Sequence, residues 1–263
     1  RATAMRYAAR GAGIWAVAGG LTVLLTFSDL VGAPPTSASV LSQFVTFVFQ
    51  LDYTRVMAIS SLVGLFVAVV ASFARARSTM AWLTFIGLAG IVVNALTGHA
   101  ANAVGHETAV NAMGFHLLGI AVWVGGLAAL VIMRRLLLTP GEGQDLAVTV
   151  ERYSVLALWS YAAVALSGIQ SGWLRVGSIA NLASAYGVLL LLKVAILVGL
   201  GVLGWQQRRS IVAALRTSPT SRATFARLAA IEVLLMVIAM GLAVALSRTA
   251  PPQLVLVPET DLV

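Results

Sequence analysis

Residues 185–206 read AYGVLLLLKVAILVGLGVLGWQ and contain one charged side chain, Lys193. An α-helix rises 1.5 Å per residue, so about 20 apolar residues cross the ~30 Å hydrocarbon core of a bilayer. Across the chain, hydrophobic residues amount to 60% and charged residues to 10%, with a mean hydropathy of +0.96. These values exclude an ordinary soluble domain and predict an all-α, polytopic transmembrane helix bundle.

Together with this segment, other apolar segments of the same kind predict about seven transmembrane spans. They are residues 11–32, 54–74, 80–98, 112–133, 153–171, 185–206 and 228–247. Residues 39–50 are too short to cross a membrane, but their apolar side chains recur at helical spacing. This pattern favours a short amphipathic helix on the outer membrane surface. Residues 139–150 (TPGEGQDLAVTV) are predicted to form a polar cytoplasmic loop, with Pro140 and Gly141 ending the preceding helix.

The basic residues are unevenly divided between the two sides of these spans. One side carries Arg1, Arg6, Arg10, Arg75, Arg77, Arg134, Arg135, Arg152, Arg208, Arg209, Arg216, Arg222 and Arg227. The other side carries only Arg55, Arg175 and Arg248. Because loops rich in Lys and Arg stay in the cytoplasm, the N-terminus is predicted to be cytoplasmic and the C-terminus external. The net charge of +8 is spread over short loops, so nucleic-acid binding is not expected.

The two ends of the sequence indicate a fragment of a longer polypeptide. The chain begins at Arg1 rather than at a methionine, and no signal peptide is visible. Residues 1–247 are predicted to form one transmembrane domain. Residues 248–263 (RTAPPQLVLVPETDLV) contain three prolines, which exclude a continuing helix, and are predicted to be an external linker towards a missing C-terminal domain.

All three histidines lie between residues 94 and 126, NALTGHAANAVGHETAVNAMGFHLLGIAVWVGG. His99 and His106 flank a short loop at the predicted outer face, and His116 lies about one turn inside the next span. Met113 precedes His116 by three residues, so a thioether and an imidazole share a helix face. The chain has no cysteine; thioether favours Cu(I) and imidazole accepts either oxidation state. We therefore predict a copper site of His99, His106, Met113 and His116; the alternative is that these histidines only hydrogen-bond at the membrane interface.

Other residues are predicted to support this site or to line a route through the bilayer. They are Asn94, Glu107, Trp123, Lys193, Met236 and Met240. Trp123 lies two turns below His116 and either floors a site or packs against a neighbouring helix. Met236 and Met240 either line a metal route or fill the core. Gly119, Gly125 and Gly126 predict the close approach of another helix.

Lys193 is expected near the middle of its span, about 12 Å from the start of that helix. A lysine there costs on the order of 2.5–3.5 kcal/mol and is usually paired or faces a polar path. Its candidate acidic partners are Glu232 and Asp29, although both are expected nearer the ends of their helices. Pairing with backbone carbonyls is the structural alternative.

Four short motifs occur in order: HLLGIAVWVGG (116–126), RYSVLAL (152–158), SG (167–168) and YGVLLLLK (186–193). Together they resemble the membrane domain of the CopD copper-resistance family, over roughly residues 80–210. The first span and the ending LSRTAPP further resemble the actinobacterial type, in which a CopD region precedes a CtaG-like cytochrome c oxidase assembly domain. The resemblance implies copper handling at the cytoplasmic membrane and supports His116 most directly. The roles of His99 and His106 depend on their clustering alone.

The predicted function is therefore the uptake or transfer of copper ions by a multi-pass protein that is not an enzyme. Walker A, HExxH and GxSxG motifs are absent. The predicted partners are the copper ion, the lipid bilayer, and a periplasmic copper chaperone or a cytochrome oxidase assembly domain. Two alternatives are a haem-b membrane oxidoreductase, with histidines as axial ligands, and a non-transporting assembly partner of cytochrome oxidase.

Overall fold

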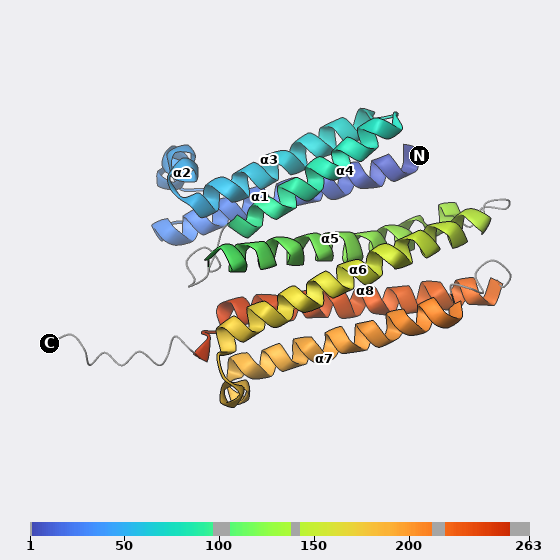
Figure 1. Ribbon diagram of the computed structural model, residues 1–263. Coiled ribbons are helices and arrows are strands. Elements are labelled where there is room, and N and C mark those ends of the chain that lie inside the picture. Colours follow the sequence, from blue (N-terminus) through green and yellow to red (C-terminus); the bar gives the residue numbers. More distant parts are fainter. Residues whose placement is uncertain (1, 97–105, 138–142, 212–218, 253–263) are drawn as a thin grey trace. The chain divides into compact units, whose positions relative to one another are not determined.

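The structure is a computed structural model that describes residues 2–96, 106–137, 143–211 and 219–252 (Figure 1). The regular elements in these residues are all helical, which confirms the predicted all-α fold. They are α1 (Ala2–Val31), α2 (Ala38–Gln50), α3 (Asp52–Phe73), α4 (Arg77–Val92), η1 (Val93–Leu96), α5 (His106–Leu137), α6 (Gly143–Val176), η3 (Ile179–Ala183), α7 (Ala185–Gln206), η4 (Gln207–Ile211) and α8 (Pro219–Arg248).

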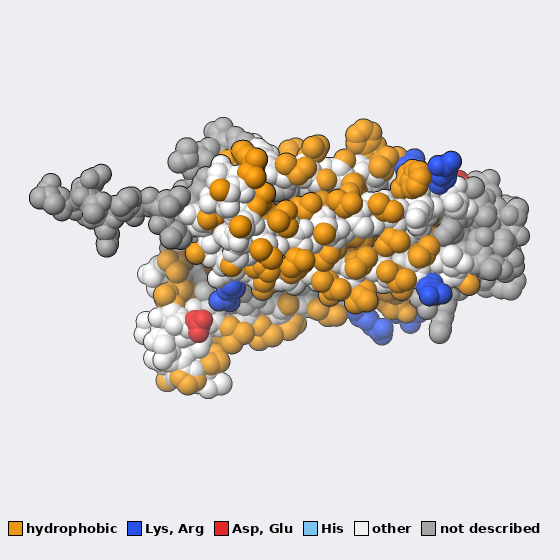
Figure 2. All heavy atoms as spheres, turned by 90° about the horizontal axis from the view of Figure 1, so that it is seen from below, with side chains coloured by type: hydrophobic (Ala, Val, Ile, Leu, Met, Phe, Trp, Pro, Cys, Tyr) orange, Lys and Arg blue, Asp and Glu red, His pale blue; other side chains and the backbone are white. Residues whose placement is uncertain are grey.

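Seven segments of the described residues are helical, long and apolar enough to cross a membrane, which confirms the predicted number. They are Thr3–Val31, Asp52–Phe73, Arg77–Ala95, Val110–Met133, Ala147–Val176, Ala185–Ser210 and Ala223–Arg248. Large apolar side chains are exposed along each of them. Figure 2 shows hydrophobic side chains spread over the visible face, with Lys and Arg mainly towards its ends. Such a surface is costly in water but matches hydrocarbon, so the chain is a multi-pass membrane protein.

The predicted amphipathic helix at residues 39–50 is confirmed as α2. The hydroxyl of Ser37 accepts a hydrogen bond from the backbone N–H of Val40, which caps the first turn. Phe47 is buried and stacks on Phe27 of α1, with ring centroids 4.1 Å apart. Val45 on the opposite side is 67% exposed. The placement of α2 on the outer membrane surface stays a prediction.

The predicted loop at residues 139–150 is wrong over its second part, because α6 already begins at Gly143. Ala147 and Val150 are almost completely buried in a hydrophobic cluster. The burial of these two side chains favours the helix over the loop that the polar run GEGQD suggested. The first helical turns of α6 therefore belong to the packed structure.

The chain divides into two compact units, residues 1–118 and 119–263, with the boundary inside α5. In the first unit, α1 and α3 approach closely at Gly64, where a Cβ would lie 3.2 Å from the backbone oxygen of Ala12 and the backbone nitrogen of Ala16. Thr54 is fully buried, and its hydroxyl donates to the carbonyl of Leu51 at 3.0 Å. The same carbonyl also accepts the backbone N–H of Arg55 at 3.0 Å, so the Thr54 hydroxyl adds a second hydrogen bond at the α2–α3 corner.

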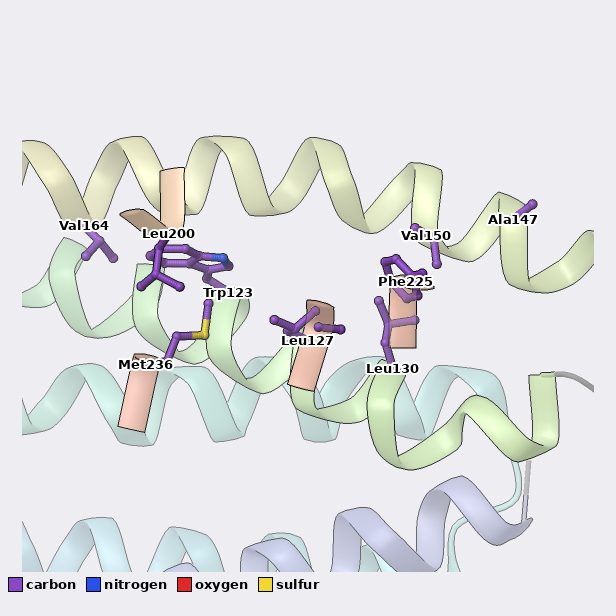
Figure 3. Close-up of a cluster of buried hydrophobic side chains, with 10 residues drawn as sticks. Trp123, Leu127, Leu130, Ala147, Val150, Val164, Leu200, Phe225 and Met236 are labelled. Carbon is purple, nitrogen blue, oxygen red and sulfur yellow. The ribbon is translucent and has the colours of Figure 1, made fainter. Parts of the chain in front are cut away.

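The second unit packs α5, α6, α7 and α8 around one hydrophobic cluster, drawn in Figure 3. Its buried members are Trp123, Leu127, Leu130, Ala147, Val150, Val164, Leu200, Phe225, Ala229 and Met236. Each of the four helices contributes at least one of these side chains. The cluster fixes which face of each helix points inward and which faces lipid.

Two glycines allow α5 and α6 to approach closely, as predicted. A Cβ at Gly119 would lie 2.7 Å from a methyl carbon of Val164, and one at Gly126 would lie 2.5 Å from the ring of Tyr153. A Cβ at Gly125 would have no other atom within 4 Å. The Tyr153 hydroxyl then reaches across the interface and donates to the backbone carbonyl of Trp123 at 2.6 Å.

The hydrogen bond from Tyr153 generates the first testable prediction. Tyr153→Phe removes the donor and should lower the free energy of unfolding by about 1 kcal/mol. The control is Tyr53→Phe, because Tyr53 is 38% exposed and its hydroxyl makes no hydrogen bond among the described residues. Thermal unfolding in detergent, followed by circular dichroism, measures both. Equal melting temperatures for the two variants would contradict the role assigned to Tyr153.

The start of α7 generates the second prediction. A Cβ at Gly187 would lie 2.5 Å from the Cα and the carbonyl oxygen of Leu182 in η3, and neither backbone atom can move independently. Gly187→Ala should therefore destabilise the protein by about 1–3 kcal/mol. Gly199→Ala on the same helix is the control, because no other atom lies within 4 Å of its Cβ position. The same thermal unfolding experiment should show no decrease in melting temperature for Gly199→Ala.

Candidate metal centre

The predicted copper ligands fall at the start of α5 and in the segment before it. His99 lies outside the described residues. His106 and Glu107 are the first residues of α5, and their side chains also lie outside the described features. The structure therefore describes the side chains of two predicted ligands, Met113 and His116.

Met113 and His116 are both half-buried and lie three residues apart on α5. Phe115 between them is 62% exposed, whereas Ala112 is buried. A Cβ at Gly114 would lie 3.8 Å from a methyl carbon of Val92, so the start of α5 packs against the end of α4 in the first unit. The thioether and the imidazole are thus on one side of α5, away from the most exposed position.

Asn94, predicted as a supporting residue, connects η1 to α3. Its side-chain amide nitrogen donates to the hydroxyl of Ser60 at 3.0 Å and to the carbonyls of Gly90 and Ile91 at 3.1 Å each. Ser60 is itself buried, with 2% of its surface exposed. These bonds hold the end of α4 in place just before the segment that contains His99.

The described side chains do not by themselves complete a metal centre. No group of three or more His, Asp or Glu residues suited to a metal ion occurs among the described residues, and the chain contains no cysteine. One imidazole and one thioether form a soft donor pair that matches copper chemistry. Further donors are needed, and the predicted ones are His99 and His106.

The remaining predicted route residues are not gathered at one place. Trp123 is buried in the core of the second unit and packs edge-to-face on Tyr161, with ring centroids 5.2 Å apart. Figure 3 shows the sulfur of Met236 next to the Trp123 ring. Met240 is 41% exposed. The two methionines therefore occupy different environments, one in the core and one at the outer surface of α8.

Lys193 lies half-buried on α7, inside the predicted span. It forms no ion pair among the described residues, so the expected acidic partner is not found there. The charge that acts on it within the second unit is the like charge of Arg175. Like charges repel each other, so this lysine is also unfavourable for a neighbouring metal cation.

Sequence reasoning missed one polar feature of the second unit. The sequence suggests Glu232 only as a partner of Lys193 near a helix end. In the structure, the Glu232 side chain is buried and lines a cavity of about 470 Å³. Gln207 of η4 is buried at the same cavity. The signal was present in the sequence, since Glu232 is the only acidic residue of its span.

Comparison with known proteins finds a family match within the second unit. The CopD family, copper resistance protein D, matches residues 147–246, which include most of α6 and α8 and all of α7. The copper transport protein CutJ of Bacillus subtilis (strain 168) is 36% identical over 122 residues, which are 46% of this chain and 22% of that protein. The chain thus spans less than a quarter of the length of this curated relative. No solved structure matches the chain. Compared with the expected range of 80–210, the family match reaches further towards the C-terminus and omits His116. Residues 147–246 are therefore similar to the CopD family.

Proposed function

We propose that this chain is a copper-handling membrane protein that takes up copper ions at the outer face and passes them into or across the cytoplasmic membrane. The observation that carries the proposal is the CopD match over residues 147–246, supported by a relative whose name describes copper transport. The seven apolar helical segments fit a transport role. The reaction is movement of an ion, and no chemical conversion is required.

The entry site of this proposal consists of His99, His106, Met113 and His116. Imidazole and thioether donors hold Cu(I) without demanding a rigid geometry, so an ion can be captured and released. The half-buried positions of Met113 and His116 support the proposal, because they leave both donors within reach of the surface. Glu107 would add a negative charge that attracts the cation.

The orientation follows from the positive-inside tendency. Arg208 and Arg209 lie in η4 at the end of α7, and Arg75 and Arg77 flank the start of α4, on the side proposed to be cytoplasmic. The segment before α5 then faces outward, where a periplasmic copper chaperone would deliver the ion. A cytochrome oxidase assembly domain is the alternative partner. Lys193 is proposed to lie off the copper route, because no acidic partner among the described residues offsets its charge.

The third prediction tests the ligands directly. Isothermal titration of Cu(I) into the detergent-solubilised chain should show affinity weakened by at least about tenfold, or about 1.4 kcal/mol, in His116→Ala. Met113→Leu keeps the size of the side chain and removes the sulfur, so it should also weaken binding. Met80→Leu is the matched control, because Met80 packs against a hydrophobic cluster of the first unit. The Met80→Leu variant should bind Cu(I) with the same affinity as the wild type.

Three results would contradict this proposal or favour one of its alternatives. Wild-type affinity in both His116→Ala and Met113→Leu would exclude the proposed entry site. An absorption spectrum of the purified protein with a Soret band would indicate haem b instead of a copper cargo. Deletion of the protein could also leave the growth response to external copper unchanged while impairing the copper loading of the oxidase. That result would favour the role of an assembly partner.

A further inference from the structure

The second unit contains a cavity of about 470 Å³ between α5, α6, α7, η4 and α8. Its walls are largely apolar and aromatic, formed by side chains such as Trp123, Leu127 and Phe225. Glu232 from α8 and Gln207 from η4 also line it. A pocket of this size has room for several water molecules.

Each of these two buried polar side chains has an atom without a hydrogen-bond partner among the described residues. Glu232 is 6% exposed and Gln207 is 5% exposed. The Glu232 Oε1 and Gln207 Nε2 atoms have no hydrogen-bond partner among the described residues. Glu232 lies roughly 14 Å along the helix axis from Ala223, where the apolar segment of α8 begins. A buried carboxylate without a partner is strongly destabilising, so it must be protonated or hydrated from the cavity.

Two tyrosine hydroxyl groups around the cavity are already engaged. The Tyr153 hydroxyl donates to the Trp123 carbonyl, and the Tyr161 hydroxyl donates to the Leu197 carbonyl at 3.3 Å. The remaining side chains with polar atoms that line the cavity are Trp123, Ser154, Trp205, Arg208 and Arg209. The guanidinium of Arg209 lies over the Trp205 ring, 5.4 Å from its centroid. Neither arginine forms an ion pair with Glu232 among the described residues. Lys193 lies about 16 Å along α7 from Gly204, the residue of that helix whose Cβ position is near the Glu232 Oε1 atom.

The donor set selects a proton over a metal ion. Ca²⁺ takes six to eight oxygen ligands and Mg²⁺ near-octahedral coordination, whereas copper prefers nitrogen and sulfur. The cavity lining provides one carboxylate, one amide, and neither histidine nor cysteine nor methionine. A proton needs only one carboxylate and a water molecule, and acidic residues inside membrane proteins serve in proton relays.

We propose that Glu232 is a proton-exchange site that binds a proton from water in this cavity and returns it to the same water. The carboxylate accepts a proton from hydronium, which becomes water, and the reverse step restores the carboxylate. Gly204 of α7 leaves space for this water, because a Cβ there would lie 3.9 Å from the Glu232 Oε1 atom. The proposal concerns residues other than the copper ligands and does not depend on the copper proposal.

The fourth prediction tests the acid itself. The full chain in lipid nanodiscs, without copper, is studied by infrared difference spectroscopy between acidic and alkaline buffer. Wild type should show a carboxylic-acid carbonyl band that is lost in Glu232→Gln and shifted in position in Glu232→Asp. Glu151→Gln on α6 is the matched control and should retain the band. A Glu232→Gln spectrum identical to that of wild type overturns the proposal, and the shifted band of Glu232→Asp excludes misfolding as the cause of a loss.

A second pair of variants tests the route of the proton. Gly204→Ala places a methyl group beside the carboxyl at ordinary contact distance, so exchange of the acid band in D₂O should become slower. Gly199→Ala adds the same methyl where no other atom lies within 4 Å and should exchange as wild type does. Equal exchange rates in Gly204→Ala and wild type overturn the assignment of this cavity as the route. Neither experiment contains copper, so failure here leaves the His116 titration unaffected.

Discussion

Hydrocarbon neither donates nor accepts hydrogen bonds, and this constraint accounts for the form of the whole chain. Backbone groups are satisfied within helices, because no solvent molecule replaces a missing partner. Side-chain hydroxyls follow the same rule: that of Ser72 donates to Ala68 and that of Ser167 to Ala163, each one turn back along its own helix. Against this background, the Glu232 Oε1 and Gln207 Nε2 atoms stand out, because both are buried without a hydrogen-bond partner among the described residues.

Helices dissolved in lipid gain little from burying apolar surface against one another, so close packing must hold them together. Gly64 brings α1 and α3 together in the first unit, and Gly119 and Gly126 bring α5 and α6 together in the second. The Tyr153 hydroxyl adds a polar contact across the second interface by donating to a backbone carbonyl of α5. Each unit therefore has its own packing, and α5 belongs to both along the chain.

The two proposed sites differ in chemistry as well as in position. Met113 and His116 in the first unit provide soft donors, which suit a copper ion. Glu232 in the second unit provides a hard carboxylate within apolar walls, which suits a proton. The family match covers Glu232 and ends well after it, whereas it does not include the soft donors. The proposal of Met113 and His116 as copper ligands therefore depends on their donor chemistry alone. The similarity to the CopD family supports the proposed copper-handling role of the chain.

The sequence by itself determined the class of fold, the number of spans and the short helix α2, and it indicated the similarity to the CopD family, because hydropathy and short motifs are properties of single segments. It failed where packing between distant segments decides the outcome. Residues 143–150 form a helix because the burial of Ala147 and Val150 in the core outweighs their polar neighbours. Lys193 lacks the expected acidic partner among the described residues, and Glu232 proved buried beside a cavity. Which side chains meet depends on how each helix is rotated about its axis, and only contacts between helices determine that rotation.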